Sequence, residues 1–259
     1  MKILFIGDIV GKPGRETIAG LLPGLKTEFK IDVVIANAEN AAGGSGITVA
    51  VADELFSQGI DVLTSGDHIF KRRESFSVID HPRILRPANL PENVPGKGLI
   101  VITVKNEKIA VINLEGRVFM NPIDCPFRVV RSLLTGIDPK VKIIIVDMHA
   151  EATSEKIALG WFLDGKVSAV LGTHTHVQTA DENILPAKTA YISDVGMTGS
   201  CASVIGRNKE QIIERFLSSI PTRFELARGD EQLQGVLVDI DEKSGQARKI
   251  KRIKRKASA

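Results

Sequence analysis

The chain has 259 residues, of which 43% are apolar and 25% are charged, and its formal net charge is +3. This length and composition allow a substantial core and exclude a short peptide, a coil or a disordered tail. No apolar run approaches the roughly 18 to 20 residues that cross a bilayer, and Gly7-Asp8 interrupts the first apolar run before a secretory signal could form. Only two cysteines occur, far apart in the sequence, so we expect a cytoplasmic protein without a disulfide framework and without membrane contact.

Short β-branched runs alternate with segments that have apolar residues at helical spacing. The runs predict buried strands, in chain order over Lys2–Ile6, Val33–Ala36, Val62–Thr64, Val141–Val146 and Val167–Leu171. The segments between them predict helices over Arg15–Leu22, Val49–Phe56, Phe127–Leu134 and Glu155–Phe162. This alternation is typical of an α/β fold.

Two regions break the alternation and predict antiparallel hairpins. One comprises Gly98–Val104 and Lys108–Leu114, and the other comprises Gly235–Asp241 and Ala247–Ile253. Hairpins beside buried single strands indicate mixed sheets. No low-complexity linker and no internal repeat divides the chain, so we expect one domain over residues 1–259 with a basic C-terminal tail, 248–259.

Polar side chains follow all five of the predicted buried strands. They are carboxylates, amides and imidazoles, namely Asp8, Asn37, Glu39, Asn40, Asp67, His68, Asp147, His149, His174 and His176. In open α/β sheets, ligands bind at the carboxyl ends of the strands. We therefore expect these side chains to converge on one site.

Four of the five histidines lie in these turns, and only His81 does not. A single histidine after a strand is more often structural than functional, but joint placement with several carboxylates favours a metal site. Neutral imidazole together with carboxylate oxygen suits Fe, Mn or Zn, and a shared carboxylate such as Glu39 can bridge two ions. His174 and His176 support this two-metal prediction, because positions i and i+2 of an extended segment face the same side.

Five short blocks of the chain follow the order found in the calcineurin-like metallophosphoesterases. These blocks are Asp8, Glu39-Asn40, Gly66-Asp67-His68, His149 and Gly172-Thr173-His174-Thr175-His176. The residues around them resemble the bacterial YmdB-like branch, as in Gly7-Asp8-Ile9-Val10-Gly11, Asn37-Ala38-Glu39-Asn40-Ala41, Met148-His149-Ala150-Glu151 and Tyr191–Gly199. The similarity runs from Lys2 to about Asp241, which is nearly the whole chain.

The resemblance implies a four-layer αββα sandwich with mixed β-sheets, and a dinuclear centre with two divalent or trivalent ions, Fe or Mn. By the family pattern, one ion would be held by Asp8, Glu39, Asn40 and His176. The other would be held by Glu39, Asp67, His149 and His174. His68 would be the general acid of an enzyme similar to those that hydrolyse phosphodiesters, including 2′,3′-cyclic nucleotides, and a homo-oligomer is expected on the same ground.

The mechanism that follows needs no protein nucleophile. Hydroxide held between the two metals is expected to attack phosphorus while His68 donates a proton to the departing ribose oxygen. The sequence contains no G-x-S-x-G elbow, no complete P-loop and no H-E-x-x-H motif, so other hydrolase classes have less support. Gly43-Gly44-Ser45-Gly46 is either a flexible turn or a loop whose backbone amides help to seat a phosphate.

Two positions depart from the family pattern. The wider superfamily has a His where this chain has Val10; the YmdB-like branch shares that loss, with Asn40 taking the vacant place. The family block Gly-Asn-His reads Gly66-Asp67-His68 here. The Asp67 carboxylate can still bind a metal, but its charge beside Glu39 weakens the Lewis acidity felt by substrate. An alternative function is therefore a metal-binding regulatory or scaffold protein with little or no turnover.

The positive net charge comes from one short segment near the end of the chain. Seven of the 34 basic residues lie in Arg248–Lys256, and without this acid-free stretch 27 basic residues face 31 acidic ones, a net charge of −4. The segment predicts either the outer strand of the last hairpin, with charges that discourage aggregation, or a surface that contacts RNA. Aromatic residues make up only 5% of the chain, which argues against a base-stacking platform.

Overall fold

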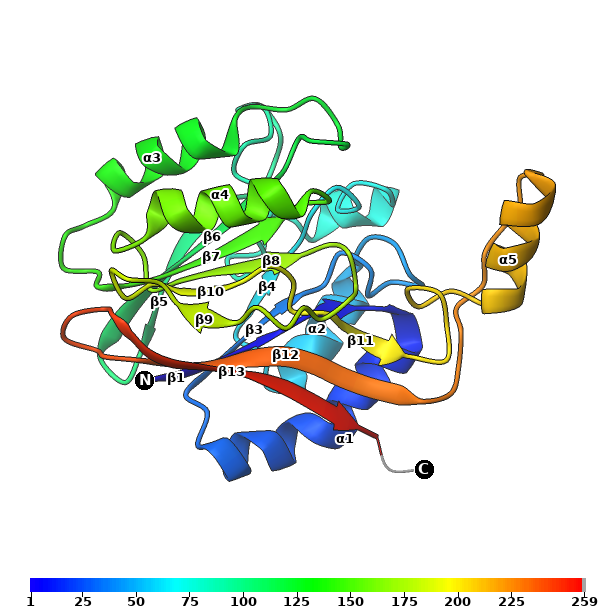
Figure 1. Ribbon diagram of the computed structural model, residues 1–259, viewed down its shortest axis with the longest axis horizontal. Helices are drawn as coiled ribbons and strands as arrows, with labels where there is room; N and C mark the ends of the chain where they lie inside the picture. Colours follow the sequence, from blue (N-terminus) through cyan, green and yellow to red (C-terminus); the bar gives the residue numbers. More distant parts are fainter. Residues whose placement is uncertain (258–259) are drawn as a thin grey trace.

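The computed structural model describes residues 1–257, so the last two residues of the predicted tail lie outside the described part of the chain. The strands form two mixed sheets that pack face to face, with helices on the outer face of each (Figure 1). This arrangement is the predicted four-layer αββα sandwich.

The first sheet has the strand order β2-β11-β12-β1-β3-β4, and β13 pairs with β12 beside this path. Its parallel centre consists of β1 (Lys2–Ile6), β3 (Val33–Asn37) and β4 (Val62–Thr64). Its antiparallel strands are β12 (Glu231–Ile240) and β13 (Ala247–Lys256). Next to β12 lies the short strand β11 (Met197–Ser200), and β2 (Asp8–Ile9) follows at the edge. The predicted last hairpin is thus confirmed as β12 and β13.

The second sheet has the strand order β5-β6-β7-β8-β10-β9. Its strands are β5 (Leu99–Val104), β6 (Glu107–Glu115), β7 (Ile143–His149), β8 (Ala169–Thr173), β9 (Asn183–Ile184) and β10 (Ala190–Ile192). The hairpin of β5 and β6 is antiparallel, whereas β6, β7, β8 and β10 run parallel to their neighbours in that order. The sheet is therefore mixed, as predicted.

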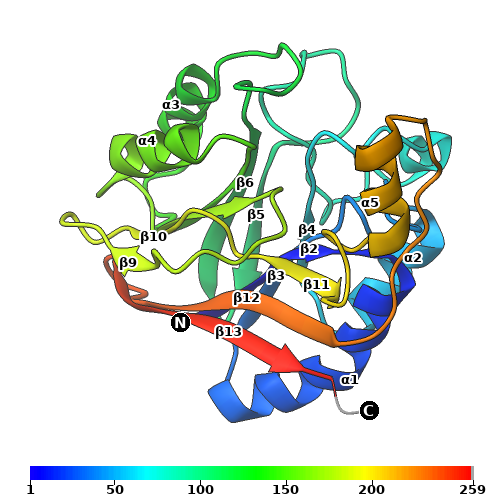
Figure 2. The same cartoon turned by 45° about the vertical axis from the view of Figure 1, so that its right-hand side comes forward.

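The helices form the two outer layers. The first sheet is covered by α1 (Gly11–Phe29) and α2 (Val49–Ser57), and the second by α3 (Pro126–Gly136) and α4 (Thr153–Leu163). A 3₁₀ turn, η1, spans Arg73–Ser77, and α5 (Lys209–Ser218) lies outside the layers, at the right of Figures 1 and 2. Across residues 1–257, every helix is too short or too polar to span a membrane.

An apolar layer between the two sheets forms the centre of the molecule. Alternate residues of β1 divide between two environments, because successive side chains of a strand point to opposite faces. Ile3 and Phe5 are buried between the sheets with Val111 and Ile145 of the second sheet, whereas Leu4 packs beneath the helices of the first sheet. The strand ends are held rigidly by this layer, so the turns that follow them are well positioned to carry a site.

Several predicted boundaries differ from the structure, and two of these differences concern a proline and a site residue. Helix α1 was expected to end at Leu22, before Pro23, but it continues to Phe29. A proline removes one helical hydrogen bond, and here Leu25 still buries its side chain beyond it. Strand β7 starts and ends further along than predicted, so His149 is its last residue and does not lie in the turn.

Candidate metal centre

The carboxyl ends of the central strands of both sheets meet at one edge of the sandwich. Asn37, the last residue of β3, lies with its Nδ2 atom 3.3 Å from Nδ1 of His149, the last residue of β7. Direct contact between side chains of different sheets shows that the two edges coincide. The predicted convergence of the polar turns is therefore present.

Four of the predicted ligands form one compact cluster. Glu39, Asp67, His149 and His174 each offer one ligand atom, and these atoms all lie within 4.8 Å of one another. Nε2 of His149 lies 3.2 Å from Oε1 of Glu39 and 3.4 Å from Oδ1 of Asp67. Nδ1 of His174 lies 3.0 Å from the same His149 nitrogen.

The other predicted ligands form a second group beside Glu39. Nε2 of His176 is 3.7 Å from Oδ1 of Asp8 and 3.3 Å from Nδ2 of Asn40. The same Asn40 nitrogen donates to Oε1 of Glu39 at 3.1 Å, so Glu39 belongs to both groups. Asn40 directs its nitrogen toward this group, and only a half-turn of the planar amide would direct its oxygen there.

The donor atoms at this edge fit a bound metal cation. Within the described chain, Oδ1 of Asp8 and Oδ1 of Asp67 are buried and have no hydrogen-bond partner. Leaving a carboxylate oxygen buried without a partner is costly, and a bound cation would remove that cost. Carboxylate oxygens mixed with imidazole nitrogens are the donor set that Mn, Fe and Zn accept.

The buried carboxylates of the cluster favour a positive charge near them. Burial raises the pKa of Asp8 to about 7. Burial also opposes a charged His149, yet the carboxylates of Glu39 and Asp67 raise the pKa of this imidazole well above its ordinary value. Burial and the nearby His149 lower the pKa of His174 to about 4, which keeps His174 in the neutral form that binds a metal.

Residues behind the cluster orient His149. Its Nδ1 atom lies 2.9 Å from Oγ1 of Thr173, which donates to Oδ1 of Asp147 at 2.7 Å. With Nδ1 held in this way, Nε2 faces Glu39 and Asp67, the arrangement usual for histidine ligands. Asp147 and Asn37 were expected among the converging polar groups, and the structure places them behind His149 instead of in the cluster.

The loop of His174, Thr175 and His176 has an unusual backbone. His174 has a φ of 102° and His176 a φ of 63°, values that side-chain-bearing residues rarely adopt. The expectation that both rings face one site because the segment is extended was therefore wrong in its reason, although both rings do reach the site. Something else must hold the loop in place.

A buried ion pair holds this loop. Oδ2 of Asp194 accepts hydrogen bonds from the backbone N of Thr175 at 3.0 Å and from its Oγ1 at 2.8 Å. The same oxygen accepts from Nζ of Lys156 at 2.8 Å, and both charged side chains are 1% exposed. Sequence reasoning missed both residues as parts of the site; the only signal was that Asp194 lies within the family-like block Tyr191–Gly199.

His68 lies at the rim of the cluster. Its backbone N donates to Oε2 of Glu39 at 3.0 Å, and its Nδ1 lies 2.8 Å from Oδ1 of Asn40. Its Nε2 atom is 3.5 Å from Oδ2 of Asp67, and about a third of the side chain, 32%, is exposed. The ring is therefore fixed at one nitrogen and accessible from the adjacent cavity.

A cavity of about 290 Å³ opens over these side chains, and His68, His174 and His176 line it. Arg207, from the loop before α5, forms part of its wall and bonds through its guanidinium group to the carbonyl oxygen of Gly44. A Cβ at Gly44 would lie 2.5 Å from Nη1 of Arg207, so a glycine is needed for this approach. Sequence reasoning missed Arg207, which no motif marks.

Comparison with known proteins defines the class of the chain. A solved structure of a Thermus thermophilus protein superposes with a TM-score of 0.95 at 38% identity, covering all of both chains. A Mycoplasma pneumoniae structure described as a phosphatase gives a TM-score of 0.94 at 36% identity, covering 99% of this chain and 93% of that one. A 5′-nucleotidase structure from Candida albicans, at 12% identity and a TM-score of 0.58, shares the fold. The chain is thus a hydrolase of the phosphatase and phosphodiesterase class with the metallophosphoesterase fold.

The sequence comparisons name the family. The model of the YmdB-like proteins matches residues 4–253, and the chain belongs to that family. A Bacillus subtilis relative, 49% identical over 254 residues, is a 2′,3′-cyclic-nucleotide 2′-phosphodiesterase; the match covers 98% of this chain and 96% of the relative. The family predicted from the sequence blocks is confirmed.

Proposed function

We propose that this protein hydrolyses 2′,3′-cyclic nucleotide monophosphates to nucleoside 3′-phosphates at a centre of two metal ions, Fe or Mn. The observation that carries the proposal is the pair of ligand groups that share Glu39, in a chain 49% identical to an enzyme of this activity. The ligands would be Asp8, Glu39, Asn40 and His176 for one ion, and Glu39, Asp67, His149 and His174 for the other.

Two cations at this edge would supply Lewis-acid polarisation of the phosphoryl group and lower the pKa of a water molecule toward neutrality. The chain supplies the geometry: Glu39 is 1% exposed and its Oε1 contacts a member of each group. His149 and His174 meet with ring centroids 4.7 Å apart and planes at 76°, so both can direct a nitrogen to one point. The acidic centre itself repels a phosphodiester unless cations are bound.

Arg207 gives the substrate phosphate or the nucleotide a positively charged wall to contact. Its guanidinium group has five donors, and the bond to Gly44 engages only part of them. Ile205, half exposed at 51%, lies beside it in the same cavity. We propose that the cyclic phosphate faces the metal centre while the nucleoside lies against Ile205 and Arg207.

We also propose the single domain expected from the sequence, because both sheets contribute to one apolar layer and to one site. The sheets meet through the layer that contains Phe5 and Ile145, and the site takes Asn37 from one sheet and His149 from the other. The scaffold alternative gains no support, because the comparisons place the chain among hydrolases. The predicted homo-oligomer stays a prediction.

His68 is the proposed general acid. Changing His68 to Ala is expected to leave both metals bound and to lower kcat for 2′,3′-cyclic AMP by about 10²- to 10⁴-fold, the usual contribution of a positioned acid. The comparison substrate is bis-p-nitrophenyl phosphate, whose leaving group needs no proton and should be much less affected. Equal losses on both substrates, or full turnover of the cyclic nucleotide with both metals present, would contradict the role.

The proposed activity is tested by loading metal-free protein with Mn or Fe and following 2′,3′-cyclic AMP by chromatography. We expect metal-dependent conversion to adenosine 3′-phosphate. Bound metal without turnover under either ion would instead favour the scaffold alternative, and a 2′-phosphate product would refute the proposed position of cleavage.

A further inference from the structure

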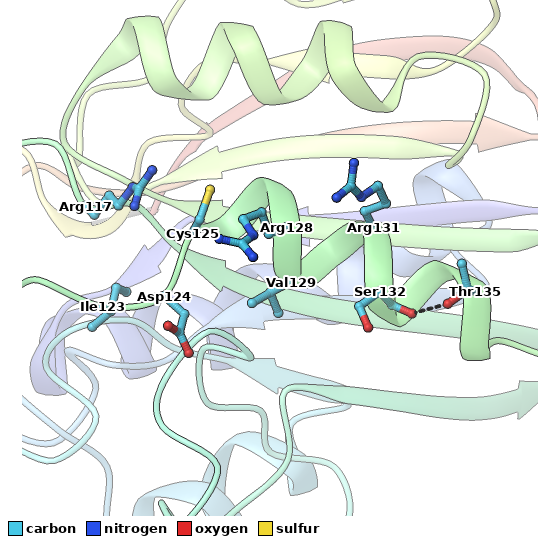
Figure 3. Close-up of a pocket in the computed structure, with 9 residues that line it drawn as sticks. All are labelled: Arg117, Ile123, Asp124, Cys125, Arg128, Val129, Arg131, Ser132 and Thr135. Carbon is cyan, nitrogen blue, oxygen red and sulfur yellow. Dashed lines mark hydrogen bonds between the residues drawn. The ribbon is translucent and has the colours of Figure 1, made fainter.

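A second cavity, of about 710 Å³, opens beside the first turns of α3 and is lined by three arginines (Figure 3). These are Arg117, from the loop after β6, and Arg128 and Arg131, which are one helical turn apart on α3. Residues three apart on a helix share a face, and Figure 3 shows Arg117 beside the start of α3, where Arg128 lies. The cavity is therefore positively charged along one wall.

No carboxylate neutralises this wall within residues 1–257. The arginines of the described chain that form ion pairs within 4.0 Å are Arg15, Arg248, Arg252 and Arg255. Asp124 also lines the cavity, but its carboxylate points away from the three guanidinium groups in Figure 3. Three neighbouring cations without a partner repel one another, and an anionic ligand would relieve that repulsion.

The loop that leads to this cavity is hydrogen-bonded to residues at or beside the metal centre. The backbone N of Gly116 donates to the carbonyl oxygen of His149 at 2.8 Å, and the backbone N of Arg117 donates to Oε2 of Glu155 at 3.1 Å. Further along the loop, Sδ of Met120 accepts from the backbone N of Glu151, a residue that lines the metal-centre cavity. The loop thus lies between the two cavities.

An exposed aromatic ring stands on the same loop. Phe119 is 88% exposed and has a φ of 63°, a conformation that costs energy for a residue with a side chain. Aromatic residues make up only 5% of the chain, and this composition does not favour an extended stacking surface. An exposed ring on this loop is nevertheless what an unpaired base can stack on.

We propose that Arg117, Arg128 and Arg131 bind the backbone phosphates of single-stranded RNA whose 2′,3′-cyclic end lies at the metal centre, with a base stacked on Phe119. The combination of an unneutralised cationic wall and an exposed ring is typical of sites that hold single strands. The inference rests on the proposed function and extends it from mononucleotides to RNA ends. It places RNA on α3 and not on the basic strand β13.

The test compares two triple variants that remove the same charge from different surfaces. One carries Arg117→Gln, Arg128→Gln and Arg131→Gln. The control carries Lys249→Gln, Lys251→Gln and Lys254→Gln, which are exposed on β13 and also test the predicted contact of the tail with RNA. Binding of metal-loaded protein to a short fluorescent oligoadenylate ending in a 3′-phosphate is measured by anisotropy across a range of salt.

We expect the arginine variant to weaken binding at least tenfold and to flatten the slope of log Kd against log salt by about 2, since each lost phosphate contact on a single strand removes about 0.7. Phe119→Ala should weaken binding about fivefold or more. The lysine control should change affinity far less. Unchanged binding in the arginine variant, or equal weakening in both triple variants, would overturn the proposal.

Turnover separates this proposal from the proposed function. The KM of the arginine variant for an oligoadenylate ending in a 2′,3′-cyclic phosphate should rise about tenfold relative to its KM for 2′,3′-cyclic AMP. An equal rise for both substrates would mean that the cavity serves the mononucleotide, and would overturn the proposal. If wild-type protein turned over neither substrate, the proposed function would fail while the binding comparison still decided the RNA site.

Discussion

A Glu39→Gln variant is expected to lose both metal ions and about a thousandfold or more of its turnover. Glu39 contacts both ligand groups through Oε1, which lies 3.2 Å from Nε2 of His149 and accepts from Nδ2 of Asn40 at 3.1 Å. Loss of the Glu39 charge should weaken the binding of both ions. Bound cations contribute several kcal/mol of transition-state stabilisation, and each 1.4 kcal/mol changes the rate about tenfold. Metal content by mass spectrometry and kcat/KM for 2′,3′-cyclic AMP measure the two effects.

Glu115→Gln is the matched control for that substitution. Glu115 is also buried, and burial raises the pKa of its carboxyl to about 7, but it lies outside the four-residue cluster. Because Glu115 is not among the four clustered ligands, replacing its carboxyl by an amide should leave metal content near the wild-type value. Retention of both metals in Glu39→Gln, or an equal loss in Glu115→Gln, would show that Glu39 is not the shared ligand.

The second large effect is expected at the buried pair of Lys156 and Asp194. Asp194→Ala removes the acceptor of Thr175 and leaves the Lys156 charge buried without a partner. Breaking a buried pair in this way costs about 3 to 5 kcal/mol, which urea unfolding of the metal-free protein would measure. Loss of a residue that orients ligands typically weakens metal binding about 10- to 100-fold.

A double variant separates positioning from simple stability. Lys156→Met with Asp194→Ala removes both buried charges, so most of the lost unfolding free energy should return. Thr175 remains without its acceptor, so competition with a chelator should still show weak metal binding. If metal affinity recovered together with stability, Asp194 would act through the stability of the fold alone and not by holding His174 and His176.

The sequence indicated the overall architecture because its strands are short, β-branched and buried. Lys2–Ile6 and Val62–Thr64 match β1 and β4 residue for residue, and the two hairpins pair as expected. Polar residues at strand ends indicated the site for a physical reason. An apolar run that stops at Asp8 or Glu39 leaves a buried charge, and buried charges are paired or bind a metal. The proposed ligands therefore all lie at one edge.

What the sequence could not indicate depends on contacts between distant segments. Lys156 lies on α4, a helix of the outer layer where a lysine is ordinarily solvated, and only the fold brings it to Asp194, 38 positions away. Arg207 and Gly44 are 163 positions apart and meet at the cavity wall. The short strands β9 and β2, of two residues each, carry too few residues for a periodic signal.

Asp67 lies in the candidate cluster, and the effect of its charge on turnover is a prediction. Its Oδ1 atom is buried in the cluster beside His149 and His174, so the departure from the family Asn does not remove it from ligand distance. Its other carboxylate oxygen, Oδ2, lies 3.5 Å from Nε2 of His68. The predicted weakening of Lewis acidity stays a prediction that an Asp67→Asn variant would test through the same assays.

Titration of metal-free protein with Mn²⁺, following bound metal and turnover of 2′,3′-cyclic AMP in the same samples, tests the central claim most directly. The two ligand groups joined by Glu39 predict binding of two ions per chain, with turnover that appears only as the second ion binds. Full turnover with one ion bound, or with none, would contradict the two-metal centre.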